Sequence, residues 1–251
     1  MLRYSVEGPV AWATLDRPEK LNAMTRQFWG ELRAVLARAE DDSSVRVLAF
    51  RGAGRCFSVG GDVAGFGQLG DAAERRGFVR DALGALASVD AFPKPTIAAV
   101  HGHALGGGCE LTMVCDIVVA DQTALFGTPE ATVGLVPGLA VVRGLAHLNL
   151  HWLKYLVFTG ETIDAHEAKA AGLVNRVTPT GGHERAAAEL AHMIAKRAPL
   201  ALAVGKALLN RHAGDGYGHA LEAVTLLQGT GDLAEGVSAF EQKRQPRFQG
   251  T

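Results

Sequence analysis

The sequence contains few cysteines: three in 251 residues, Cys56, Cys109 and Cys115, with no Cys-x-x-Cys pair. A small, odd number of cysteines argues against a disulfide framework and fits free thiols in a reducing compartment. The N-terminus also lacks the basic-then-apolar order of a secretory signal and the Arg- and Ser-rich character of a transit peptide. We therefore expect a cytoplasmic protein.

Long apolar runs and an excess of one charge are absent as well. No apolar run approaches the roughly 18 residues that a membrane span requires, and 25 Lys and Arg residues nearly balance 26 Asp and Glu residues. Binding to nucleic-acid phosphates needs a concentrated positive field, which this composition does not supply. With 48% hydrophobic residues, the sequence predicts a water-soluble globular protein that binds neither membrane nor nucleic acid.

Two motifs of well-known enzyme classes are missing or lack their structural context. Gly-x-Ser-x-Gly does not occur, so a serine-hydrolase elbow has no support. Residues 65–70 match G-x-G-x-x-G, with Asp90 at the later spacing of a ribose ligand. No expected strand directly precedes these glycines, however, as a dinucleotide site requires. We therefore expect no dinucleotide cofactor.

The histidines do not form a convincing metal site. His147 and His151 share a helix face, as metal ligands can, but no third ligand is evident. His101 and His103 can point to one side of a strand end, where one hydrogen bond satisfies a buried imidazole. We interpret all four as packing residues and expect no metal.

Hydrophobic periodicity predicts an α/β protein in which paired strands precede helices, in the order ββα rather than βαβ. A composition shift at residues 196–199 divides the chain into an α/β core over 1–195 and a C-terminal helical region over 196–251. The expected strands are 2–6, 9–15, 45–50, 95–100, 117–120 and 174–177, and the expected helices are 26–40, 72–90, 107–115 and 183 to the tail.

Two glycine-rich turns expose backbone where strands give way to helices or loops, over residues 56–62 and 105–110. Glycine lets an amide approach a ligand closely, and unpaired amides at a helix N-terminus carry partial positive charge. Two such N–H groups converging on one oxygen form an oxyanion hole, worth about 3–4 kcal/mol per donor. The alternative is that both are simply tight turns.

Two glutamates stand in apolar surroundings near these turns. Glu110 lies three residues after Gly107, one turn into the expected helix and on the face of the exposed amides. Glu130 follows Pro129 between apolar segments. Carboxylates paired in a dry pocket push their pKa values apart, which suits one for base and the other for acid work.

Short fragments in a fixed order connect the sequence to a known family. They are Leu15–Met24 (LDRPEKLNAM), Phe57–Asp62 (FSVGGD), Ala98–Leu111 (AAVHGHALGGGCEL), Cys115-Asp116, Phe126–Glu130 (FGTPE), Pro137-Gly138, Phe158–Gly160, Glu167-Ala168, Gly172–Asn175, Glu235-Gly236, Ala239-Phe240 and Lys243-Arg244. In their number, order and spacing, over essentially the whole chain, they resemble the crotonase superfamily, the enoyl-CoA hydratase/isomerase family.

The resemblance implies a crotonase-like spiral of ββα units with C-terminal helices that assemble trimers, which often pair into hexamers. Members bind acyl-CoA thioesters and stabilise an enolate oxygen, as in the β-oxidation of fatty acids. Coenzyme A then belongs to the substrate, and no separate cofactor is needed. Simple double-bond isomerases often retain only the later glutamate, so the presence of both favours hydration.

The resemblance also implies roles for individual residues. The N–H groups of Gly61 and Gly107 match the two oxyanion donors. Glu110 matches the base that activates water for addition at C3 of a 2-enoyl-CoA, and Glu130 the acid that delivers a proton to C2. The N–H of Gly138 would help to hold the water.

Coenzyme A carries phosphates, so a nearly neutral protein needs local cations. The resemblance implies substrate and coenzyme A contacts at Arg17, Lys20, Ala23, Val59, Gly60, Asp62, Phe240 and Lys243. Lys94 is a further candidate, but an ordinary surface charge explains it equally well. Family members also bring the C-terminal helix of a neighbouring subunit to the coenzyme, and Phe240 and Lys243 are expected to act in this way.

One segment departs from the family pattern. After Gly138, hydratases commonly read Ala-Gly-Gly-Thr-Gln-Arg, whereas this chain reads Leu-Ala-Val-Val-Arg-Gly over 139–144. We hypothesise that Arg143 pairs with Glu130 and lowers its pKa. Two alternatives to a hydratase remain open: an isomerase or other enolate-using enzyme, and a non-catalytic acyl-CoA-binding or assembly protein in which this segment has closed the water site.

Overall fold

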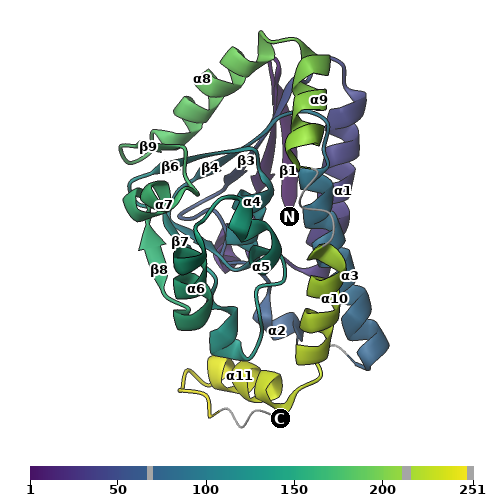
Figure 1. Cartoon of the computed structure of the whole chain (residues 1–251), viewed down its shortest axis with the longest axis vertical. Helices are drawn as coiled ribbons and strands as arrows, with labels where there is room; N and C mark the ends of the chain where they lie inside the picture. The colour runs from purple at the N-terminus through teal and green to yellow at the C-terminus, as the bar shows by residue number, and fades with distance from the viewer. Residues whose placement is uncertain (67–69, 211–215, 248–251) are drawn as a thin grey trace.

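The computed structural model describes residues 1–66, 70–210 and 216–247 (Figure 1). The strands are β1 (Leu2–Glu7), β2 (Val10–Leu15), β3 (Val47–Gly52), β4 (Thr96–Val100), β5 (His103–Leu105), β6 (Ile117–Asp121), β7 (Leu125–Gly127), β8 (Thr162–Asp164) and β9 (Arg176–Thr178). The α-helices are α1 (Arg26–Asp41), α2 (Val63–Phe66), α3 (Ala72–Asp90), α4 (Gly107–Val114), α5 (Ala140–Arg143), α6 (Leu150–Thr159), α7 (Ala165–Ala171), α8 (His183–Ala195), α9 (Pro199–Leu209), α10 (Gly216–Leu227) and α11 (Gly231–Glu241). Short 3₁₀ helices are η1 (Pro18–Lys20), η2 (Pro129–Val133) and η3 (Gly144–Ala146).

A six-stranded sheet in the order β1-β2-β3-β4-β6-β9 forms the centre of the fold. The β1–β2 hairpin is antiparallel, and β2, β3, β4, β6 and β9 then run parallel. Their register places Phe50 beside Ala98, and Ala98 beside Val118. Because all five parallel strands end at one edge, the loops that follow β3, β4 and β6 start close together.

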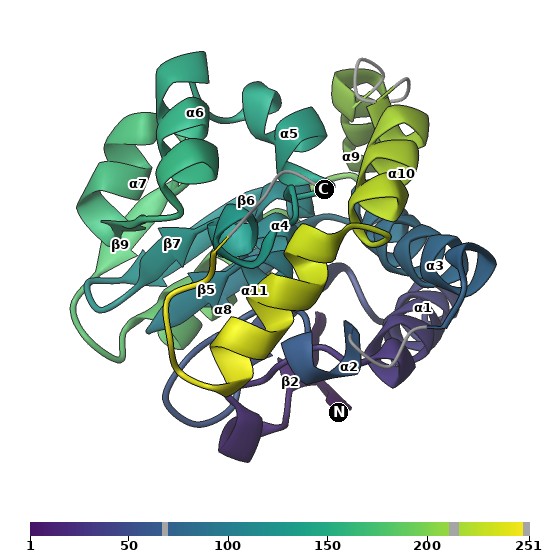
Figure 2. The same ribbon diagram turned by 90° about the horizontal axis from the view of Figure 1, so that it is seen from below.

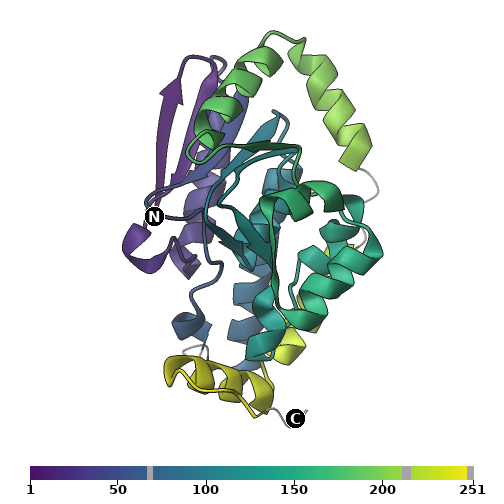
Figure 3. The ribbon, with the colours of Figure 1, turned by 90° about the vertical axis from the view of Figure 1, so that its left-hand side faces the viewer.

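Alternate residues of these strands bury two opposite faces of the sheet. Trp12 and Ile97 pack on one face against α8, with the small side chains of Ala187 and Ala191 allowing close approach. Phe50 and the other inward residues belong to the main core, which α1, α3 and α4 share. α8 contacts β2, β3, β4, β6 and β9, and Figure 3 shows it lying along the strands of the central sheet.

A smaller three-stranded sheet, in the order β5-β7-β8, lies beside the central sheet (Figure 2). β5 follows β4 directly and β7 follows β6, so successive turns of the chain place one strand in each sheet. This arrangement agrees with the expected ββα spiral. Strands of only three residues carry little periodicity, and β5, β7 and β8 were not predicted. β9 is equally short; it was expected over 174–177 and lies at Arg176–Thr178.

The C-terminal helices extend away from the central sheet (Figure 1). α8 ends at Ala195 and α9 begins at Pro199, and the division of the chain into regions at 195/196 stays a prediction. Lys206 of α9 anchors this helix to the core by an ion pair of 2.8 Å with Asp116. α10 packs on α3, and α11 packs on η2 and α2. Within the described ranges, no helix is long and apolar enough to cross a membrane.

Asn22 ties the segment after β2 to the loop after β3. Its side-chain N–H groups donate to the carbonyl oxygens of Ala53, Cys56 and Phe57 at 2.9, 2.9 and 3.1 Å, and its Oδ1 accepts from the backbone N–H of Arg17 at 2.9 Å. The residue is 2% exposed and has a φ of 57°, a left-handed conformation that asparagine tolerates better than most residues. One amide thus organises two loops.

Replacing Asn22 with alanine is expected to lower the free energy of unfolding by about 2–4 kcal/mol, because several buried carbonyl groups lose their donor. Urea denaturation measures the change. Gln27→Ala is the control, since the exposed Gln27 side chain bonds only Glu31 within the same helix, and it should cost less than about 0.5 kcal/mol. Equal losses in both variants would contradict the assigned role of Asn22.

Candidate active site

Two glycine turns meet at the edge of the sheet where β3 and β4 end. A Cβ atom on Gly60 (φ 88°) would lie 2.7 Å from the carbonyl oxygen of Leu105 and 2.9 Å from the amide nitrogen of Gly107. A Cβ atom on Gly108 would lie 2.6 Å from the carbonyl oxygen of Ser58. Any side chain at these two positions would push the turns apart, so glycine is required for their contact.

The amides expected to form an oxyanion hole lie at this contact. A Cβ atom on Gly107 would lie 3.8 Å from the amide nitrogen of Gly61, so the two residues are direct neighbours. The bridge between Met24 and Gly61 uses the carbonyl of Gly60 and the N–H of Asp62. Within the described chain, the N–H groups of Gly61 and Gly107 therefore have no acceptor. Gly107 also begins α4, whose dipole adds positive potential there.

Glu110 lies on the first turn of α4 and is 7% exposed. Its Oε1 accepts hydrogen bonds from the backbone N–H groups of Leu139 at 2.6 Å and Ala140 at 3.0 Å. Burial raises the pKa of Glu110, and the two N–H groups oppose this by stabilising the carboxylate. Glu110 is thus the member of the glutamate pair that is equipped to carry the negative charge.

Glu130 lies on the first turn of η2, and its Oε2 is buried without a hydrogen-bond partner among the described atoms. Its Oε1 would lie 3.0 Å from a Cβ atom on Gly106, which places the carboxyl beside the second glycine turn. Burial, and next the charge of Glu110, raise the pKa of Glu130 to about 8. Of the two carboxyls, Glu130 is therefore the one that the site favours in its protonated form.

The hypothesis that Arg143 pairs with Glu130 is wrong. The Arg143 guanidinium instead donates from Nη2 to Oδ1 of Asp90 at 2.8 Å, and both side chains are buried. Gly138 immediately precedes the two residues whose amides bind Glu110. Its role in holding water stays a prediction.

The expected coenzyme A contacts of this subunit gather where residues 17–23 lie along residues 59–62. Nη1 of Arg17 donates to Oδ2 of Asp62 at 2.7 Å and to the carbonyl oxygen of Ala23 at 3.4 Å. A phosphate at this place would therefore share Arg17 with a carboxylate. That these residues bind coenzyme A stays a prediction.

The remaining expected contacts differ in their surroundings. Lys20 is exposed at the end of η1, and Val59 lies next to Gly60 with its N–H bonded to the Leu21 carbonyl. Lys94 is not available to a phosphate, because its Nζ donates to the carbonyl oxygens of Ala39, Glu40 and Asp42 and so ends α1. Lys94 is therefore a half-buried residue at the end of α1, rather than the phosphate contact or the ordinary surface charge that the sequence suggested.

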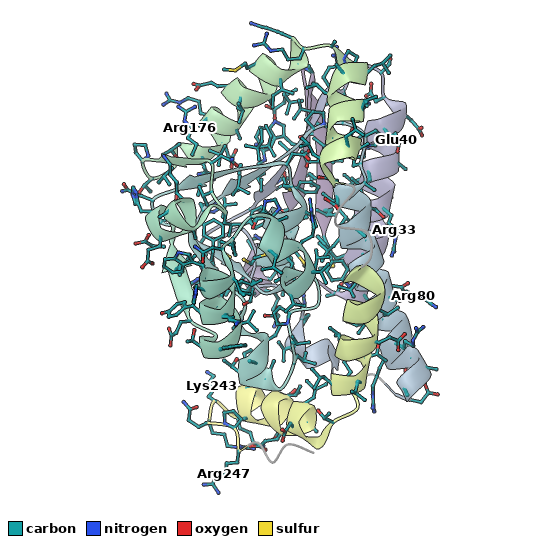
Figure 4. The ribbon with its side chains drawn as sticks, in the orientation of Figure 1. Arg33, Glu40, Arg80, Arg176, Lys243 and Arg247 are labelled. Atoms are coloured by element: carbon teal, nitrogen blue, oxygen red, sulfur yellow. The ribbon has the colours of Figure 1, made fainter. Side chains whose placement is uncertain are left out.

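Phe240 and Lys243 lie at the end of α11, away from the central sheet (Figure 4 labels Lys243). Phe240 is 59% exposed, which leaves its ring available to another molecule. Within its own chain, α11 covers η2 closely enough that a Cβ atom on Gly236 would lie 2.4 Å from the Val133 carbonyl oxygen. A contribution of these two residues to a neighbouring subunit's substrate stays a prediction.

Two histidines lie together where β4 ends and α8 begins. His101 stacks on His183 with ring centroids 4.7 Å apart, and its Nε2 lies 3.0 Å from the Gly54 carbonyl oxygen. Across the residues that the structure describes, no three His, Cys, Asp or Glu side chains are grouped to hold a metal ion.

Part of the G-x-G-x-x-G match, residues 67–69, lies outside the described residues, and β3 ends well before it.

Comparison with known proteins places this site in a family. A family model described as enoyl-CoA hydratase/isomerase matches residues 5–251. The 2,3-dehydroadipyl-CoA hydratase of Escherichia coli is 38% identical over 254 residues, which cover 99% of this chain and 98% of that protein. The chain belongs to the enoyl-CoA hydratase/isomerase family.

Further relatives of the enoyl-CoA hydratase/isomerase family agree with this assignment. The short-chain-enoyl-CoA hydratase of Clostridium acetobutylicum is 36% identical over 244 residues, or 95% of this chain and 93% of that protein. The crystal structure of an enoyl-CoA hydratase/isomerase from Xanthobacter autotrophicus Py2 superimposes with a TM-score of 0.90 at 30% identity, covering 96% of this chain and 93% of that one. The crotonase resemblance and its α/β spiral fold are confirmed.

The sequence interpretation missed the donors to Glu110 and the partners of Arg143. Leu139 and Ala140 act through their backbone, so no side-chain pattern marks them. Asp90 was noted only as a possible ribose ligand, although it ends α3 and pairs with Arg143. The apolar segment around an isolated arginine was the one available signal, because a buried arginine needs a carboxylate partner.

Replacing Glu130 with glutamine is expected to stabilise the protein at alkaline pH. The pKa of Glu130 is about 8 in the folded chain, compared with the ordinary value of 4.5 that applies to the unfolded chain. The folded state therefore holds a proton that the unfolded state loses, and the free energy of unfolding falls as pH rises between these values. Above pH 8 the variant should have a Tm several degrees higher than the unsubstituted protein, since one pKa unit corresponds to about 1.4 kcal/mol and ~1 kcal/mol to roughly 2–4 °C at this size.

Differential scanning calorimetry from pH 5 to 9 measures this effect. The Tm difference between Glu130→Gln and the unsubstituted protein should be small at pH 5 and grow with pH. Glu161→Gln is the control, because Glu161 is exposed and its replacement should leave the pH dependence of Tm unchanged. A Tm difference that does not vary with pH would contradict the raised pKa of Glu130.

Proposed function

We propose that the protein is an enoyl-CoA hydratase that adds water across the double bond of a 2-enoyl-CoA thioester. The observation that carries the proposal is a pair of glutamates with unequal surroundings beside two amides that have no acceptor in the described chain. Glu110 accepts two backbone N–H bonds, whereas Oε2 of Glu130 has no partner in the described structure. The family assignment supports an acyl-CoA substrate, and the named hydratases among its relatives support the reaction.

In the proposed mechanism, the N–H groups of Gly61 and Gly107 hold the thioester oxygen. The ionised Glu110 takes a proton from water as the water oxygen bonds to C3, and the electron pair of the double bond moves to form an enolate. The N–H groups stabilise the negative charge on the enolate oxygen more strongly than the neutral carbonyl. Glu130 then donates its proton to C2, completing the addition of H and OH.

The assignment of acid and base follows from electrostatics. A general base must be ionised and a general acid protonated near the working pH. Burial raises the pKa of both carboxyls; the N–H groups of Ala140 and Leu139 oppose this at Glu110, whereas the charge of Glu110 adds to it at Glu130. One proton shared unequally between two carboxyls gives each its role without a metal.

We expect Glu110→Gln and Glu130→Gln each to reduce hydration of crotonyl-CoA by about 10²–10⁴-fold, the usual contribution of a general acid or base. Loss of ultraviolet absorbance of the conjugated alkene measures hydration. Binding of saturated butyryl-CoA, measured by calorimetry, should change little, since glutamine preserves shape. Full activity in either variant would contradict the hydratase mechanism, and double-bond migration of a 3-enoyl-CoA without water uptake would favour an isomerase.

We further propose that the C-terminal helices assemble the chain into a trimer or a dimer of trimers. Apolar side chains at Leu200, Val204 and Leu208 recur every four residues along α9 and are 80%, 58% and 52% exposed. This spacing lines one helix face, and a contiguous exposed apolar face is typical of a protein interface.

The three free cysteines, all buried, are compatible with the expected cytoplasmic location.

Replacing Leu200 and Val204 together with glutamate is expected to dissociate the oligomer. Analytical ultracentrifugation at micromolar concentration should give three or six times the 26.4 kDa chain mass for the unsubstituted protein and a lower multiple for the variant. Charge in an interface without a partner is strongly unfavourable. Arg185→Glu on α8, 85% exposed at its side chain, is the control. A monomeric unsubstituted protein would overturn the proposal.

A further inference from the structure

Arg143 lies in the segment that departs from the family pattern, and its side chain joins three elements of the fold. Nη2 donates to Oδ1 of Asp90 at 2.8 Å and to Oδ1 of Asn210 at 3.2 Å. Asn210 in turn donates from Nδ2 to the Asp90 carbonyl oxygen at 3.0 Å and to Oδ1 at 3.1 Å. Arg143 is 7% exposed and Asp90 6% exposed. The end of α5 is thus bonded to the ends of α3 and α9.

The other end of α5 holds Glu110. This helix spans only four residues, and the N–H of Arg143 bonds the carbonyl of Leu139 at 2.7 Å. The guanidinium and the amides that bind Glu110 therefore belong to the same turn of backbone. A single turn has little stability of its own, because nucleation of a helix is unfavourable. Its orientation must come from contacts with the rest of the fold.

We propose that Arg143 is a positioning residue, which fixes α5 on Asp90 and Asn210 so that the amides of Leu139 and Ala140 stay on the carboxylate of Glu110. Arg143 does not touch the reacting atoms. It acts through the backbone of one helical turn. The proposal rests on the proposed function, in which Glu110 is the base.

Electrostatics favours this indirect route over a direct effect of charge. Burial raises the pKa of Glu110, and the N–H groups of Ala140 and Leu139 oppose this. The positive charge of Arg143 is balanced by Asp90 at 2.8 Å. Loss of the guanidinium should therefore reach Glu110 chiefly through a displaced α5.

Other titratable groups lie near the two ends of this arrangement. Glu130 and Cys109 are close to Glu110, and the pKa of the Cys109 thiol is raised by burial and then by the two glutamates. His147 is close to Arg143, and its pKa is lowered by burial and then by that guanidinium. A shift of the acidic limb of the pH profile alone would be assigned to Glu110, the proposed base, rather than to Glu130, Cys109 or His147.

The pH profile of kcat/KM for crotonyl-CoA hydration tests the proposal. The acidic limb reports ionisation of the base in the free enzyme. In Arg143→Met this limb should move up by about one pH unit, because a carboxylate that loses hydrogen bonds from N–H groups ionises less readily. Arg143→Lys retains a charged donor to Asp90 and should recover most of the shift.

Arg51→Met is the matched control. Arg51 also forms a guanidinium–carboxylate pair at 2.8 Å, with Glu184, but it lies on β3 over the Trp12 ring, on the face of the sheet that α8 covers. Its profile should keep the acidic limb of the unsubstituted enzyme. A similar shift in Arg51→Met, or no shift in Arg143→Met, would overturn the positioning role.

Asp90→Asn keeps the proposal testable if Arg143→Met does not fold. This variant replaces the carboxylate that accepts from Arg143 with a neutral amide. The contact is weakened, and the acidic limb should again move to higher pH. An unshifted limb in Asp90→Asn would count against the proposal in the same way. Failure of the proposed function is distinguishable, because the unsubstituted protein would then not hydrate crotonyl-CoA, or Glu110→Gln would retain hydration, whatever the Arg143 variants show.

Discussion

The contact between two backbone turns is the constraint on which the candidate site depends. Ser58, in the loop after β3, forms an isolated bridge with Ala104 of β5, the strand that follows β4. The segments that leave β3 and β4 therefore remain side by side beyond the end of the central sheet. The turns then approach so closely that Gly60 and Gly108 have no room for a Cβ atom. The amides of Gly61 and Gly107 come together because the backbone itself, rather than any flexible side chain, sets their spacing. Donors held this way need no reorganisation during a reaction.

The same contact brings two carboxyls into a poorly hydrated space, at a cost in stability. Burying an ionised carboxylate is unfavourable unless hydrogen bonds replace its water. The fold supplies such bonds to Glu110 and supplies none to Oε2 of Glu130. In the proposed mechanism, this difference in stabilisation separates the base from the acid. The burial that lowers the stability of the fold would then also be the cause of the different roles of the two carboxyls.

The sequence predicted best what depends on local periodicity and backbone conformation. The helix expected over 72–90 coincides with α3, and the glycine turns lie where their composition placed them. The partners of long polar side chains could not be predicted. Lys94 ends α1, and Arg143 pairs with a carboxylate 53 positions earlier in the chain. Such choices depend on which surfaces meet in the folded protein, and no short-range pattern encodes them.

The unusual segment over 139–144 is compatible with the site because of the groups it contributes. Glu110 is bound by main-chain N–H groups, which leucine and alanine supply as well as the alanine and glycine common in hydratases. Side-chain identity there is free to change provided that the turn keeps its direction. Gly138 has less freedom, since a Cβ atom would lie 3.0 Å from both Leu83 and Val224. An arginine bonded to two helix ends can maintain that direction where the sequence of the turn itself has diverged.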